Sequence, residues 1–423
     1  MLRSLVGSEM CIRDRSNTDA TGGGHIYASG DQSIVTSGGS VTFGGGDLTG
    51  SGYAEGTSAS LPEGIRFYAG LSVNTSVKTN GVSTGGGDIV LRGRSFTSSN
   101  YALGAFGVGV ENATILDSGT ATIRIDGISQ VSSGDAYNMG VRLLRDVTAT
   151  SASTSATAIH ITGSGGSAGS NFSGGQGVRL TGGGNLITTT GVGGGIKISG
   201  TPGSQAWAVV IEGGSILSSS GPIELSGTAA NSYVFLKNTP TLGFKAGTAV
   251  TSSTANILIS FFDADWGDTA NPIIATSGSF TFRPSGTTFN RSVAPGWFNL
   301  PTTLSALTVG SPTNTAYVYV SSALTVQGPV TMQGGYVEVT QPISAAGDIL
   351  LDADTGAGLA ASIHGVYSNA AISTTAASNG NITIIGRGGN SGSNYGVFLH
   401  SGSNLTAGGS GAITITGQGG INA

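Results

Sequence analysis

Short triplets with aliphatic residues at both outer positions recur along the chain, and they constrain its fold more than any other feature. The first set comprises Ile89–Leu91, Ile123–Ile125, Ile159–Ile161, Ile196–Ile198 and Ile223–Leu225, then Ile349–Leu351, Ile382–Ile384 and Ile413–Ile415. Successive members are 34, 36, 37 and 27 residues apart, and then 33 and 31. A variable period near 30 residues is typical of a solenoid whose loops absorb the differences in length.

A second set of triplets follows the first in the same phase. It comprises Val108–Val110, Val141–Leu143, Val178–Leu180, Val209–Ile211, Val234–Leu236 and Val397–Leu399, and a weaker third set follows near Ile115, Leu186, Ile216 and Leu405. Side chains of a strand alternate between its two faces, so the outer aliphatic residues should point inward and the middle residues outward. Three strands per turn predict an all-β chain: a right-handed parallel β-helix, that is, a three-sided β-solenoid.

The composition supports a folded chain that is far from the globular average. Of the 423 residues, 74 are glycine and 9% are charged, the net charge is −5, and the hydrophobic fraction of 38% is too high for a disordered protein. The 17 Lys and Arg are scattered, so no basic patch for nucleic acid is predicted. No apolar run is long enough for a membrane-spanning helix.

The sequence suggests four segments. Residues 1–15 resemble a translated sequencing adapter and are set aside as non-native, which removes Cys11, the only cysteine. Residues 16–253 are predicted to form β-helix coils, residues 254–346 a variant section with tighter coils, and residues 347–423 further coils that stop within a repeat. The chain is therefore expected to be an internal fragment of a longer protein.

Several runs carry a family resemblance. Phe280–Pro284, Leu304–Gly310, Leu324–Val326 and Gly347–Ala353 look like the repeats of large filamentous-haemagglutinin-like secreted proteins. The resemblance covers roughly residues 87–423, while the family's secretion domain and barrel are missing. It implies a β-helical exoprotein of the bacterial cell surface, exported by two-partner secretion or as an autotransporter through an outer-membrane transporter barrel.

Acidic residues form the only plausible metal-binding clusters. Asp263, Asp265 and Asp268 are the densest group of carboxylates, and Asp352 with Asp354 is the next. Calcium prefers several such oxygen ligands, yet neither group has the closing glutamate of an EF-hand or the repeats of a calcium β-roll. Solvated acidic turns are the preferred interpretation, with calcium as the alternative.

No catalytic set or cofactor motif is recognisable. Glu212 and Glu224 could form the carboxylate pair of a glycan hydrolase only if they met on adjacent coils. The histidines at positions 25, 160, 364 and 400 are dispersed, and solvated strand positions account for them better than catalysis does.

The middle positions of the second strands suggest a binding face. Phe235, Tyr367 and Phe398 occupy such positions, and stacking of coils would align them in outward columns. Exposed apolar columns mark interaction surfaces, although inserted loops could cover them. In the coil of residues 380–420, Phe398 and the loop Arg387–Tyr395 are the places where a partner is expected first.

The sequence thus predicts a non-enzymatic repeat region of a surface-exposed or secreted bacterial adhesin. It would act as an extended rod that contacts a protein or glycan of a host or neighbouring cell. The alternatives are a polysaccharide-active β-helix enzyme and a purely structural spacer. An enzyme requires a cleft with converging carboxylates, whereas a spacer requires only small polar residues on its outer faces.

Overall fold

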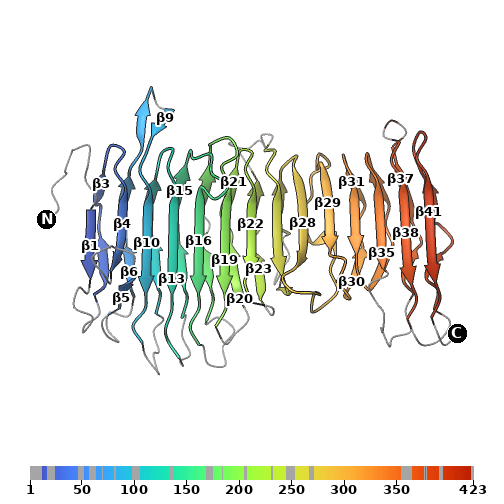
Figure 1. The fold of residues 1–423 in the computed structure, drawn as a ribbon, viewed down its shortest axis with the longest axis horizontal. Coiled ribbons are helices and arrows are strands. Elements are labelled where there is room, and N and C mark those ends of the chain that lie inside the picture. Colours follow the sequence, from blue (N-terminus) through green and yellow to red (C-terminus); the bar gives the residue numbers. More distant parts are fainter. Residues whose placement is uncertain are drawn as a thin grey trace. The chain divides into compact units, whose positions relative to one another are not determined.

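The computed structural model is an all-β protein (Figure 1). The described residues are 12–16, 24–45, 52–56, 63–68, 70–80, 82–97, 105–132, 138–167, 175–182, 184–203, 207–229, 232–243, 253–265, 271–353, 364–375, 377, 379–389 and 394–420. Within these ranges the only helical element is a single 3-10 turn, η1 (Pro295–Trp297). The chain divides into two compact units, Met1–Ala255 with Ala264–Pro272 and Asn256–Asp263 with Ile273–Ala423. The short strand β26 (Asp263–Asp265) falls where the division lies in the sequence.

Parallel sheets make up the first unit. The first sheet contains β1 (Ile12–Ser16), β4 (Val41–Gly45), β10 (Ile89–Arg94), β13 (Ile123–Ile128), β16 (Ile159–Ser164), β19 (Ile196–Thr201) and β22 (Ile223–Gly227), with β5 (Ala54–Glu55) beside β10. The second sheet contains β2 (Ile26–Ser29), β6 (Ile65–Tyr68), β11 (Val108–Glu111), β14 (Val141–Leu144), β17 (Val178–Thr181), β20 (Trp207–Glu212) and β23 (Tyr233–Lys237). The third sheet contains β3 (Ser33–Val35), β7 (Ser72–Asn74), β12 (Ile115–Asp117), β15 (Thr148–Ser151), β18 (Leu186–Thr189), β21 (Ser215–Ser218) and β24 (Thr241–Gly243).

From β10 onward the chain visits these sheets in a fixed order, one strand in each per coil. The antiparallel hairpin of β8 (Val77–Thr79) and β9 (Val82–Gly85) stands away from the stacked strands (Figure 1). β1 pairs in parallel with β4, so part of the segment set aside as non-native in the sequence joins the sheet, whereas residues 1–11 lie outside the described part.

The strand register agrees with the aliphatic triplets. Ile89, Ile123, Ile159, Ile196 and Ile223 are paired one after another across the first sheet. The second sheet aligns Val108, Val141, Val178, Val209 and Val234 in the same way. All ten of these side chains are at most 1% exposed. Stacked coils therefore bury aliphatic faces that no coil could bury alone, and the prediction of an all-β chain with long parallel sheets is confirmed.

Glycines let the chain turn from the first sheet to the second. Gly127 is the second-to-last residue of β13 and Gly140 directly precedes β14, and a Cβ at Gly127 would lie 2.0 Å from the carbonyl oxygen of Gly140. Gly163 and Gly177 repeat this pairing in the next coil, again at 2.0 Å. Two backbones in such close contact leave no room for a side chain, which explains why glycine stands two positions after the triplet.

The next corner, between the second and third sheets, uses pairs of left-handed residues. Asn112 and Ala113, Arg145 and Asp146, Gly213 and Gly214, and Asn238 and Thr239 all have positive φ angles. This corner is short: three residues separate Glu111 from Ile115, whereas thirteen separate Arg94 from Val108 at the preceding corner. Differences in coil length are therefore taken up mainly between the first and second sheets.

The second unit has parallel sheets of the same kind. One contains β25 (Ile257–Phe261), β28 (Ser279–Pro284), β29 (Ala306–Gly310), β32 (Val330–Gln333), β35 (Ile349–Ala353), β38 (Ile382–Arg387) and β41 (Ile413–Gln418). Another contains β30 (Tyr317–Val320), β33 (Tyr336–Val339), β36 (Val366–Ser368) and β39 (Val397–Leu399). The last contains β31 (Leu324–Val326), β34 (Ile343–Ala345), β37 (Ala371–Thr374) and β40 (Asn404–Thr406), and β27 (Ile273–Ala275) also belongs to this unit.

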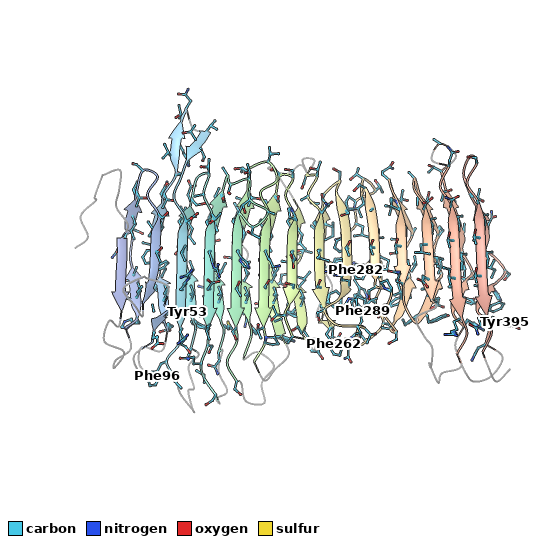
Figure 2. All side chains as sticks on the ribbon, viewed as in Figure 1. Tyr53, Phe96, Phe262, Phe282, Phe289 and Tyr395 are labelled. Carbon is cyan, nitrogen blue, oxygen red and sulfur yellow. The ribbon has the colours of Figure 1, made fainter. Side chains whose placement is uncertain are left out.

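Phenylalanines replace aliphatic residues in part of this unit's core. Phe261 packs against Phe289 with ring centroids 4.9 Å apart, and Phe280 packs edge-on against Phe298 at 4.8 Å. Phe282 lies among them (Figure 2). These bulky rings fill the interior where the sequence departs from the regular repeat.

Candidate functional site

Aromatic side chains gather on the outward side of the sheet β30–β33–β36–β39. Valines at the alternate positions of these strands, such as Val318, Val337 and Val366, are fully buried. The residues between them must therefore point away from the core. We call this outward surface the aromatic face, and it comprises Trp297, Tyr317, Tyr319, Tyr336, Glu338, His364, Tyr367, Tyr395, Phe398 and His400.

Strand register sets the order of these side chains. Tyr319 pairs with Glu338, Glu338 with Tyr367, and Tyr367 with Phe398, so these four residues form one row across four neighbouring strands. Tyr317 and Tyr336 form the start of a second row. Adjacent strands are about 4.8 Å apart, which is close to the spacing of stacked rings.

One end of the aromatic face is a stack of tyrosines. The rings of Tyr317 and Tyr336 are nearly parallel, with centroids 4.7 Å apart, and Tyr317 also stacks on Tyr319 at 5.3 Å. Trp297 donates a hydrogen bond from Nε1 to the Tyr319 hydroxyl over 3.3 Å. These contacts fix the rings, so the tyrosines present a preformed surface.

The other end combines two histidines with aromatic rings. Phe398 contacts Tyr367 at 5.6 Å, Tyr395 at 5.2 Å and His364 at 5.0 Å between ring centroids. His400 lies beside Phe398 at 5.8 Å. Burial lowers the pKa of His364, and its Nδ1 accepts a hydrogen bond from the backbone N–H of Tyr395. Both observations favour the neutral imidazole, which adds another flat ring to this end.

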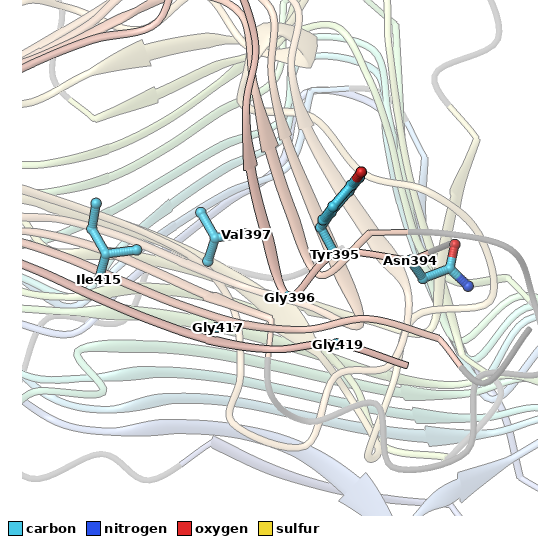
Figure 3. Close-up of a pocket in the computed structure, with 7 residues that line it drawn as sticks. All are labelled: Asn394, Tyr395, Gly396, Val397, Ile415, Gly417 and Gly419. Atoms are coloured by element: carbon cyan, nitrogen blue, oxygen red, sulfur yellow. The ribbon is translucent and has the colours of Figure 1, made fainter. Parts of the chain in front are cut away.

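The Tyr395 ring at this end is exposed, with 53% of its surface accessible. A hollow beside it is lined by Asn394, Tyr395, Gly396, Val397, Ile415, Gly417 and Gly419 (Figure 3). Glycines and one exposed aromatic ring form most of this lining, and it contains no charged residue. Val397 and Ile415 are in register with the buried Val366 and Ile384, so the hollow is the inward side of the last described coil and is not part of the aromatic face.

Glu338 is the only carboxylate in the row of aromatic side chains. Burial raises the pKa of Glu338 above its ordinary value. Burial, together with the nearby Tyr367, raises the pKa of Tyr336 to about 12. Both shifts indicate that the centre of the aromatic face is partly shielded from water.

The predicted binding residues have different outcomes. Tyr367 and Phe398 lie side by side, as the proposed column requires. The expectation that Phe235 is exposed was wrong, because only 6% of its surface is accessible. Phe235 belongs to the first unit, where Trp207 stacks on it with ring centroids 4.9 Å apart. The indole of Trp207 therefore covers this middle position of the strand.

Sequence reasoning missed most of the aromatic face. The alternation Tyr317-Val318-Tyr319-Val320 and the lone Tyr336 place rings at outward positions, and that signal was present in the sequence. Trp297 could not be predicted, because it belongs to η1 and reaches the face through the fold.

A further expectation concerned the coil of residues 380–420. Ile382 and Ile384 are buried as expected, but Leu399 is 38% exposed. β39 is the last strand of its sheet among the described residues, so one side of Leu399 has no neighbour there.

The acidic residues do not assemble into a metal site within the described part of the chain. Asp263 is 1% exposed, accepts a hydrogen bond from Asn290 Nδ2 over 2.8 Å and forms an ion pair with Arg291. The Asp265 side chain, Asp268 and Asp354 lie outside the described residues. No group of three potential ligands occurs among the described His, Cys, Asp and Glu side chains.

Each of the two candidate catalytic glutamates forms its own ion pair. Glu212 lies on β20 and binds Arg179 over 3.0 Å, while Glu224 lies on β22 and binds Lys197 over 3.0 Å. The two strands belong to different sheets. His160 lies between Arg124 and Lys197 in the strand register, and its pKa is lowered first by burial and then by Arg124.

Comparison with known proteins identifies no relative of the chain. No family model, no curated protein and no solved structure matches the chain. No helix in the described ranges is long and apolar enough to cross a membrane. Functional inference therefore depends on the aromatic face itself.

Proposed function

We propose that the chain is part of a surface-exposed or secreted bacterial adhesin and contributes an extended, non-enzymatic binding surface. The observation that carries this proposal is the aromatic face. Its rings are partly exposed, lie on a rigid parallel sheet and are fixed by contacts with one another. Tyrosine and tryptophan give large contact areas at a low cost in conformational entropy, which favours a binding role over that of a plain spacer.

The scaffold that we propose is a right-handed, three-sided β-helix. In the first unit, the chain passes through three parallel sheets in a repeating order, as in β13, β14 and β15. Crossovers between parallel strands of one sheet are almost always right-handed, because of the twist of the strands. Such a scaffold holds outward side chains at regular intervals and suits a filament that projects from a cell.

The partner that we propose is a protein or glycan on the surface of a host or neighbouring cell. Aromatic rings match the apolar faces of sugars and the side chains of proteins. Export through an outer-membrane transporter barrel, with the chain displayed at the cell surface, completes this proposal. It rests on the resemblance of runs such as Phe280–Pro284 to filamentous-haemagglutinin-like repeats.

Binding of the purified, fluorescently labelled protein to panels of cells and immobilised glycans tests the proposal. The double variant Tyr367→Ala/Phe398→Ala removes two adjacent rings from the face. The matched control, Thr331→Ala/Thr383→Ala, changes two half-buried outward threonines of another sheet in the same unit. We expect saturable binding that the ring variant loses and the control keeps. Binding by the ring variant that equals that of the control would defeat the aromatic face as the binding surface, and absence of binding by the parent protein would support the spacer alternative.

A further inference from the structure

Glu338 differs from every other glutamate that the structure describes. Glu55, Glu63, Glu111, Glu212 and Glu224 each form an ion pair with an arginine or lysine. Among the described residues, Glu338 has no cationic partner and no hydrogen-bond donor to its carboxylate. It has tyrosines on both neighbouring strands instead, Tyr319 on one side and Tyr367 on the other.

A partly buried carboxylate without a partner is costly, because burial disfavours its charged form. The raised pKa of Glu338 reflects that cost. A cation placed above the carboxylate would offset this cost of burying a charge. The negative faces of the neighbouring rings would also attract the cation. The register therefore places an aromatic residue on the strand at each side of Glu338.

We propose that Tyr319, Glu338 and Tyr367 bind a quaternary ammonium group, and that its source is a choline headgroup on a cell surface. This inference rests on the proposed adhesive function and names the ligand class of the same face. Tyr317 and Tyr336, which stack on one another beside this row, extend the aromatic surface that the methyl groups of the ligand would contact.

The chemistry of the site favours a quaternary ammonium over a lysine or arginine side chain. A lysine ammonium is strongly hydrated and has three N–H donors to satisfy, and a guanidinium has five. The row supplies one carboxylate, and the Tyr319 hydroxyl already accepts a hydrogen bond from Trp297. A quaternary ammonium has no N–H donor, so a single charge and several ring faces satisfy it.

Isothermal titration of the full chain with choline tests the inference, with 3,3-dimethylbutan-1-ol as a neutral compound of the same shape and Nα-acetyl-lysine amide as a primary ammonium. We expect saturable choline binding, weaker at high salt because the attraction is electrostatic. The neutral compound and the lysine derivative should bind at least roughly tenfold more weakly. Equal affinity for the neutral compound, or tighter binding of the lysine derivative, would overturn the inference.

Variants locate the site. Glu338→Gln and Tyr367→Ala should each weaken choline binding by roughly tenfold, with the circular dichroism spectrum unchanged. The control Glu224→Gln removes a carboxylate that pairs with Lys197 on another sheet and should leave the affinity unchanged. Choline binding that is unaffected by Glu338→Gln would refute the assignment.

Vesicles identify the source of the ligand. Co-sedimentation with phosphatidylcholine vesicles but not with phosphatidylglycerol vesicles is expected, and free choline should compete. Failure to bind choline while cell binding still depends on Tyr367 and Phe398 would refute this inference alone. If the parent protein binds neither choline nor cells, the adhesive function is refuted as well.

Discussion

The indole of Trp207 lies flat against the phenyl ring of Phe235, with centroids 4.9 Å apart and planes inclined by 4°. Phe235 is thereby buried, although it occupies the middle position of a strand triplet. Phe398 occupies the middle position of a triplet in the second unit and remains partly exposed.

Alanine substitutions at these two phenylalanines should differ in their effect on the free energy of unfolding. Phe235→Ala leaves a cavity under Trp207 and should lower the free energy of unfolding by about 3 kcal/mol. Phe398→Ala removes a partly exposed ring and should cost less than about 1 kcal/mol. Urea unfolding followed by far-ultraviolet circular dichroism measures both values. Equal losses would contradict the burial of Phe235.

Equivalent glycines in two successive coils should differ in their tolerance of a side chain. Gly386 and Gly417 are paired in register, but a Cβ at Gly386 would lie 2.0 Å from the Gly396 carbonyl oxygen. The nearest atom to a Cβ at Gly417 is 3.3 Å away. Gly386→Ala should therefore destabilise the protein by several kcal/mol, because the backbone must shift, whereas Gly417→Ala should change stability by less than about 1 kcal/mol. Thermal unfolding midpoints provide the comparison, and a tolerated Gly386→Ala would disprove the close approach.

Strain at the corner between the second and third sheets can be relieved. Thr239 is exposed and has a φ of 48°, which a β-branched residue rarely adopts. Thr239→Gly should raise the free energy of unfolding by up to about 1 kcal/mol, after allowing for the greater freedom of glycine in the unfolded chain. Thr325→Gly, at an exposed strand position, should instead lower it. A loss of stability in both variants would show that Thr239 is unstrained.

The stability of the protein should depend on pH through Glu338. Its pKa in the folded state is raised above the ordinary value of 4.5, so the folded protein holds this proton more tightly than the unfolded chain does. Ionisation of Glu338 therefore costs stability at neutral pH, and this cost disappears as the pH falls through the raised pKa to below 4.5.

Glu338→Gln should accordingly be more stable than the parent protein at pH 7 and equal to it at acid pH. Unfolding midpoints across this pH range measure the difference. Glu224→Gln, which breaks the ion pair with Lys197, should give no gain at pH 7. A constant difference at all pH values for Glu338→Gln would exclude this titration as the cause.

Asp263 should be structural and should not respond to calcium. Its buried carboxylate already binds Asn290 and Arg291, so Asp263→Ala should destabilise the protein by about 2 kcal/mol by leaving both without a partner. Calcium added to the parent protein should leave the unfolding midpoint unchanged. A midpoint that rises with calcium and falls with a chelator would restore the metal-site hypothesis.

The regular part of the fold could be predicted because its sequence signal is local and repeated. Aliphatic residues such as Ile89 and Ile123 recur at alternating positions, and each repetition adds a strand to the same sheet. Glycines such as Gly127 mark the turn for a steric reason that holds in several coils. The left-handed pairs were not predictable, because Ala113, Arg145 and Thr239 are unusual residues for positive φ.

The candidate site could be predicted only in part. Tyr367 and Phe398 were found because they occupy the same position in related coils. Phe235 occupies that position too, and its burial depends on Trp207, whose ring stacks on it although the two residues are not register partners. The special character of Glu338 arises from what surrounds it in three dimensions, namely Tyr319 and Tyr367 and the absence of a cation among its described neighbours.

The unequal corners of the first unit have a consequence for how such a chain can diversify. Five residues join Thr201 to Trp207, and thirteen join Arg94 to Val108, yet the strands on either side keep the same register. The edge between the first and second sheets thus accepts insertions and deletions while the ladder of backbone hydrogen bonds is kept, whereas the corner between the second and third sheets holds only two to four residues. New loops could be grafted at that edge, by evolution or by a protein engineer, with the coils beneath them left intact.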